Sequence, residues 1–207
     1  MLLIKNGYIK TMAGPDIENG SILIGDDGKI AAVGKDLIVL EGCTIVDAKG
    51  RLVTPGLVEA HCHTGLHNEA VGWEGIDYNE GVDPVTPQRR AIDSIWPMDE
   101  AFRLARQGGV TTCCTGPGSA NVLGGTFVAI KTAGKRVDDM IVKYPIAMKC
   151  AFGENPKRFY GQQAKKAPKT SMGTAALLRE TPFKAKNYMA KKDRGEEPAF
   201  DMKLEAM

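Results

Sequence analysis

Short apolar runs separated by turn signals fill the first fifty residues. The runs over residues 2–11, 20–34 and 42–56 contain Asn-Gly, Asp-Gly and Lys-Gly pairs, and this pattern is typical of short β-strands. Asp27 and Gly28 separate two apolar halves of the second run and predict a hairpin, because a tight turn there needs a positive φ. We therefore predict a small β unit over residues 1–51.

From residue 52 the pattern changes to strands that alternate with helices. Residues 52–63 read as a continuous apolar strand of the kind that is buried on both faces, and a long polar loop follows over residues 67–95. Residues 97–109 predict a helix, with Met98 and Phe102 on its apolar face. Further strands are expected from residue 110 and from residue 145, and this alternation predicts an α/β fold with a parallel sheet.

The last fifty residues favour helix. Residues 173–180 and 183–195 predict two helices or one helix with a sharp kink, because Pro182 is tolerated as a first helical residue with Thr181 as its N-cap. Asp201 is the predicted N-cap of a last helix, which has no stop signal before the sequence ends. This suggests that the sequence is part of a longer chain.

Composition limits the classes of function. The 207 residues are 43% hydrophobic and 25% charged, with a net charge of +2, which is ordinary for a globular protein and gives no reason to expect nucleic acid. Neither a membrane span nor a signal peptide is apparent in the sequence, so we expect a cytoplasmic protein. The five cysteines include no CxxC pair, and we expect reduced thiols.

All three histidines lie between residues 53 and 67. In a β-strand, His61 and His63 point to the same face and could bind one metal ion together. They come at the end of an apolar strand, and this is the edge of a parallel sheet where active sites assemble. From this spacing alone, a metal site and a pair of incidental histidines that bond to the backbone are about equally plausible.

The segment VTPGLVEAHCHTG, residues 53–65, resembles the first-strand signature of the amidohydrolase superfamily, in which a Pro-Gly pair and two apolar residues precede Asp or Glu and HxH. The resemblance continues through DPVTPQRRAID, ARQGGVTT, GPGSANVLGGT and AFGENPKRFYG. These segments are similar to bacterial amidohydrolases related to imidazolonepropionase, and together they span nearly the whole chain.

The resemblance implies a TIM-type (β/α)8 barrel, of which residues 52–207 would form the first half. Residues 1–51 would be the N-terminal part of a composite β-sandwich domain. It also implies one or two divalent metal ions, with Zn²⁺ expected and Mn, Fe, Co or Ni compatible with the same ligands. The metal activates water against a non-peptide C–N bond, such as that of a cyclic amide, in a small-molecule substrate.

Carried over residue by residue, the resemblance assigns His61 and His63 as metal ligands. The third ligand in many relatives is a carboxylate or a carboxylated lysine on a later strand. We assign it to Glu154, at the end of a strand, rather than to Lys149; the alternative is that Glu154 caps the following loop. His67 and Trp73 in the polar loop are candidates for contact with substrate.

The departures from the family pattern concern the rest of the site. The superfamily also uses histidines on its fifth and sixth strands and an aspartate on its eighth, whereas this chain has no histidine after His67. We expect an N-terminal portion without the acid/base residue, and its exposed sheet edges predict association. The alternatives are an inactive fragment or a metal-binding module that assembles with a complementary C-terminal fragment, or a homo-oligomer.

Overall fold

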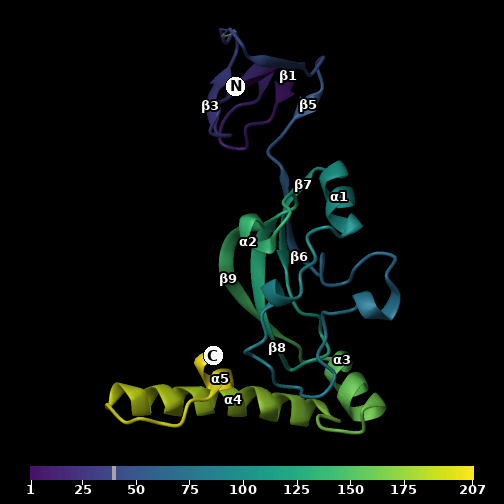
Figure 1. Ribbon diagram of the computed structural model, residues 1–207, viewed down its shortest axis with the longest axis vertical. Coiled ribbons are helices and arrows are strands. Elements are labelled where there is room, and N and C mark those ends of the chain that lie inside the picture. The colour runs from purple at the N-terminus through teal and green to yellow at the C-terminus, as the bar shows by residue number, and fades with distance from the viewer. Residues whose placement is uncertain (39–40) are drawn as a thin grey trace. The chain divides into compact units, whose positions relative to one another are not determined.

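The computed structural model describes residues 1–38 and 41–207 and divides into two compact units, Met1–Gly56 and Leu57–Met207. Each unit has its own β-sheet (Figure 1). The unit boundary interrupts the apolar run that we predicted as one strand. Strand β5 (Leu52–Val53) pairs in the first sheet and β6 (Leu57–Cys62) pairs in the second. Pro55 lies between them, and its lack of an N–H group suits a break in the pairing.

The first unit is a sheet of short strands. Its order is β3-β2-β1-β4, and β5 also pairs with β1. The four longer strands are β1 (Leu2–Ile9), β2 (Ile17–Ile24), β3 (Ile30–Gly34) and β4 (Thr44–Asp47). Strands β2 and β3 form the expected antiparallel hairpin, and Gly28 in its turn has a φ of +74°.

The second unit contains a four-stranded mixed sheet. Its order is β6-β7-β8-β9, with β7 at Val110–Thr115, β8 at Leu123–Lys131 and β9 at Ile141–Cys150. Only β6 and β7 are parallel, whereas β8 is antiparallel to both of its neighbours. The predicted all-parallel sheet is therefore wrong. The connection from β7 to β8, residues 116–122, is too short for the crossover of a dozen or more residues that parallel strands require.

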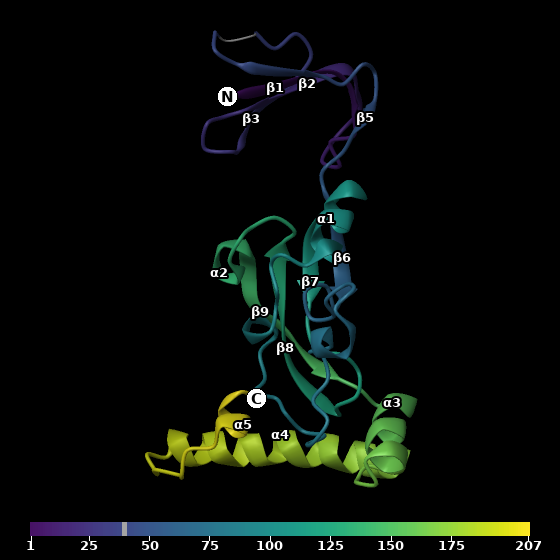
Figure 2. The same ribbon diagram turned by 45° about the vertical axis from the view of Figure 1, so that its right-hand side comes forward.

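The arrangement is a mixed α/β fold, and the described residues form no closed barrel. Strands β6 and β9 are the two edges of the sheet in Figure 2. Our prediction that β6 is buried on both faces is wrong, because Leu57 and Val58 are 56% and 63% exposed. The apolar sequence of this strand thus marks a surface in the described part of the chain, not a core.

The core of the second unit lies between the sheet and helix α1 (Glu100–Gln107). Phe102 of α1 packs with Leu66, Val128 and Ile130, all of them buried. The predicted helix is confirmed, with Asp99 as its N-cap. Met98 lies before the helix and is 64% exposed, so it does not belong to the apolar face that we assigned to it.

The remaining helical segments of the second unit are short, apart from α4. They are η1 (Gly72–Gly75), η2 (Ala91–Asp93), α2 (Val137–Met140), α3 (Glu154–Pro156), the π-helical segment η3 (Lys157–Gln163), α4 (Ser171–Asp193) and α5 (Met202–Glu205). No helix in the described ranges combines the length and apolar character needed to cross a membrane.

Helix α4 runs unbroken through Pro182, so the prediction of two helices is wrong. Thr181 is not an N-cap; its hydroxyl donates to the Leu177 carbonyl oxygen at 2.9 Å. The helix-favouring residues on both sides therefore outweigh the cost of about 3 kcal/mol that an internal proline carries. The predicted cap of α5 is confirmed, since the Asp201 carboxylate accepts from the Lys203 and Leu204 amides.

Candidate metal centre

The two predicted metal ligands stand together at the end of β6. The ring centroids of His61 and His63 are 5.5 Å apart, and the rings are nearly perpendicular. His63 Nδ1 lies 2.7 Å from the carbonyl oxygen of Gly116. Because a carbonyl oxygen only accepts, Nδ1 carries a proton, and in the neutral imidazole Nε2 then has a free lone pair. A backbone partner of this kind is typical of histidines that bind a metal through the other nitrogen.

Lys149 of β9 reaches the same place from the other edge of the sheet. Its Nζ lies 3.4 Å from His61 Nε2. Phe127 of β8 lies beside both groups, with its ring centroid 5.1 Å from the His61 ring and 5.9 Å from Lys149 Nζ. Lys149 is only 9% exposed, and this burial lowers the pKa of its ammonium group below the ordinary value. The environment therefore makes the charged form of Lys149 less favourable than that of a lysine in water.

Gly116 gives the site its close backbone approach. A Cβ atom at this position would lie 2.3 Å from the Phe127 ring, nearer than side-chain carbons approach. Only glycine lets the chain after β7 pass over Phe127 while its carbonyl faces His63. This contact gives one physical reason for the glycines in the segment that follows β7.

Tyr78 is a member of the site that sequence reasoning missed. Its ring stacks on His63 at a centroid distance of 5.2 Å and on His67 at 5.4 Å, within 16° of parallel in both cases. His67 is thus next to the pair: the Tyr78 ring stacks on both imidazole rings, and the His67 amide donates to the His63 carbonyl oxygen at 3.2 Å. The sequence shows Tyr78 only as an aromatic residue within a polar loop. That pattern does not distinguish a residue that stacks on a histidine from one on the surface.

Asp99 holds the loop that follows His63. Its carboxylate is buried, with the residue 2% exposed, and it accepts from the amides of Gly65, Glu69 and Ala101 at 3.1 to 3.2 Å. Gly65 has a φ of +81° and lies so close to the Phe102 ring that a Cβ atom would lie 2.9 Å from it, so glycine is the residue that fits there. One side chain therefore caps α1 and fixes the start of the loop.

The structure does not bring the other predicted residues to the pair. The Glu154 side chain is 88% exposed and bonds to Lys157 at 3.0 Å, within α3 and η3. Trp73 is 79% exposed on η1. Within residues 1–38 and 41–207, no three or more His, Cys, Asp and Glu side chains form a group that could hold a metal. The side chains with nitrogen donors that lie close together here are those of His61, His63 and Lys149.

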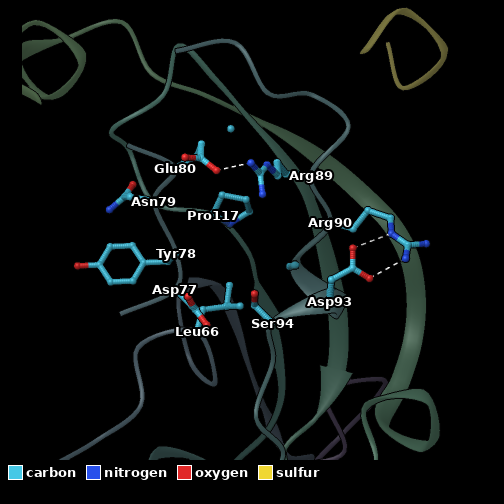
Figure 3. A pocket seen from close by; sticks show the side chains of 12 residues that line it. Leu66, Asp77, Tyr78, Asn79, Glu80, Arg89, Arg90, Asp93, Ser94 and Pro117 are labelled. Carbon is cyan, nitrogen blue, oxygen red and sulfur yellow. Dashed lines mark hydrogen bonds and ion pairs between the residues drawn. The ribbon is translucent and has the colours of Figure 1, made fainter. Parts of the chain in front are cut away.

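A polar pocket of about 200 Å³ adjoins the site. Figure 3 shows Tyr78 and Asn79 at one end and two arginines at the other. Both arginines face carboxylates: Arg89 pairs with Glu80, and Arg90 pairs with Asp93 at 2.6 Å. The positive charges of this pocket are therefore neutralised within it.

Comparison with known proteins identifies the family. The whole chain superposes on an amidohydrolase from Thermotoga maritima MSB8 with a TM-score of 0.91 and 41% identity, and covers 54% of that chain. The chain belongs to the amidohydrolase superfamily. Amidohydrolase tasK of Hapsidospora irregularis is 35% identical over an alignment of 170 residues that covers 75% of this chain and 17% of that protein.

A dihydroorotase of Caldicellulosiruptor saccharolyticus is 33% identical over 118 residues, which are 56% of this chain and 22% of that protein. No family model matches the sequence. The chain thus spans about half the length of the solved relative and less than a quarter of these two curated ones.

Proposed function

We propose that this chain carries the first part of a metal-dependent amidohydrolase site, which cleaves a non-peptide C–N bond such as that of a cyclic amide. The observation that carries the proposal is the meeting of His61, His63 and Lys149 on one face of the second sheet. A relative that is named dihydroorotase supports a small cyclic substrate.

The donor set fits a divalent metal. His63 has its Nε2 free, and His61 Nε2 faces the buried Lys149 amine. A neutral lysine can add its nitrogen to the carbon of CO2 and release one proton, and the carbamate so formed offers oxygen ligands. Two imidazoles and a carbamate suit Zn²⁺ and are compatible with Mn, Fe, Co or Ni. When bound, the metal polarises the substrate carbonyl and activates water.

The protein's own groups orient the ligands. The Gly116 carbonyl fixes the tautomer of His63, and the stacked Tyr78 ring restricts its rotation. Phe127 provides an apolar neighbour for His61 and Lys149 that keeps water from their inner side. In this proposal Lys149 takes the position that sequence reasoning gave to Glu154, whose side chain lies in solvent.

Zinc titration calorimetry in bicarbonate buffer tests the proposal. We expect binding near one ion per chain, weakened at least about tenfold by His61→Ala or Lys149→Met. Glu154→Gln should bind like the wild type. The matched control is Lys143→Met, an exposed lysine on the same strand. Carbon NMR with labelled bicarbonate should show a carbamate signal that Lys149→Met removes.

Other results of these zinc-binding measurements would distinguish the alternatives to the proposed site. Loss of zinc in Glu154→Gln, with Lys149→Met unaffected, would restore Glu154 as the third ligand. No zinc binding by the wild type would refute the proposed site. Tight zinc without hydrolysis of cyclic amides would favour a metal-binding module that a second polypeptide completes, as the exposed edge strand β6 would permit.

A further inference from the structure

A second cleft, of about 350 Å³, opens beside His63. Its volume is within the range of small-molecule sites. Besides His63 and the Tyr78 ring, its polar lining comes mainly from Asn79, Asn155, Arg158 and Gln163. The cleft therefore combines several amide groups with one guanidinium group, and none of its lining residues is an aspartate or glutamate.

Arg158 is the unusual member of this lining. Among the described residues no carboxylate forms an ion pair with it, although Glu154, four residues earlier, pairs with Lys157. The arginines of the neighbouring pocket differ, because Arg89 and Arg90 each face a carboxylate (Figure 3). The positive charge of Arg158 is thus open to a ligand in the cleft.

The backbone of η3 places Arg158 and Gln163 on the same side. In an α-helix, residues five apart point about 140° away from each other. Here the segment is π-helical, and the Ala164 amide donates to the Phe159 carbonyl oxygen five residues earlier at 3.0 Å. The wider turn brings both side chains into one cleft, and π-helical turns of this kind are frequent at functional sites.

We infer that this cleft binds a carboxylate of the substrate, with Arg158 as the charged donor and the Gln163 and Asn155 amides as further donors. A guanidinium binds a carboxylate through two parallel hydrogen bonds. The one positive charge in the lining matches the single charge of a carboxylate better than the higher charge of a phosphate. The inference rests on the proposed function, because it assumes that the C–N bond to be cleaved lies at the His63 end of the cleft.

The substrate class that follows is a small cyclic amide that bears a carboxylate. Hydantoin-5-acetate and its neutral analogue hydantoin-5-acetamide differ only in that group. Calorimetry on the 207-residue chain, with and without zinc, should show at least about tenfold tighter binding of the acetate, a factor equal to ~1.4 kcal/mol. Arg158→Gln should abolish this preference, and Arg158→Lys should restore part of it.

The matched control is Arg179→Gln, which removes the same charge from an exposed position on α4. This variant should keep the preference, and urea unfolding should give equal midpoints for both glutamine variants. Equal binding of the two probes by the wild type, no binding of either, or an unchanged preference in Arg158→Gln would each overturn the inference. Preference for the acetate in a protein that binds no zinc would refute the proposed metal site alone.

Discussion

Asp99→Ala should be among the most damaging single changes to the second unit. The buried carboxylate accepts three backbone amide hydrogen bonds, two from the loop after His63 and one from the first turn of α1. A hydrogen bond to a charged acceptor contributes about 1.5 kcal/mol or more, and buried amides left without partners add to the loss. Because the three lengths are at the long end of the normal range, we expect a loss of about 3 kcal/mol.

Urea unfolding, followed by circular dichroism, measures this loss. Asp201→Ala is the matched control, because Asp201 caps α5 from an exposed position and should cost about 1 kcal/mol at most. Asp99→Asn keeps the shape of the side chain and one acceptor oxygen, so its loss of stability should lie between those of Asp99→Ala and Asp201→Ala. If Asp99→Ala lost no more stability than Asp201→Ala, the role assigned to the buried carboxylate would be refuted.

Two further perturbations test the site and the fold. Gly116→Ala should cost about 1 to 3 kcal/mol in urea unfolding and weaken zinc binding, since its Cβ would meet the Phe127 ring. Gly14→Ala should be neutral, because the nearest atom to its Cβ would be Thr11 Oγ1 at 4.0 Å. Burial raises the pKa of Asp83, but the hydrogen bonds from Lys203 and the Val85 amide and the nearby charges of Lys203 and Arg89 together lower it below the ordinary value. Stability from this pair is present above the ordinary pKa and lost as pH falls. Asp83→Asn should therefore be slightly destabilised at pH 7, and its difference from the wild type should be smaller at pH 3; an equal difference at both pH values would contradict this.

Local signals predicted the local elements. The Asp27-Gly28 turn, helix α1 and the Asp201 cap each depend on a few neighbouring residues, and each is present in the structure. The pairing of His61 and His63 on one strand end also follows from a spacing of two residues. Such features can be predicted because the interaction that stabilises them lies within one turn or one strand.

Long-range features could not be read from the sequence in this way. The direction of β8 depends on the length of the loop before it, and the strand pattern of residues 123–131 is the same for either direction. Lys149 reaches His61 across 88 positions, so no spacing rule connects them. Pro182 stays inside α4 because flanking residues outweigh it, which is a balance of energies and not a motif.

The π-helical turn of η3 has an evolutionary consequence. Deletion of one residue between Arg158 and Gln163 would let the segment close ordinary α-helical turns. Arg158 and the present Gln163 would then be four positions apart, and residues at that spacing in an α-helix lie within about 40° of each other around the helix axis. Loss of a single codon could therefore shorten this segment and still leave both side chains on one side of the helix, so a lineage of such proteins could keep the pair through such a change.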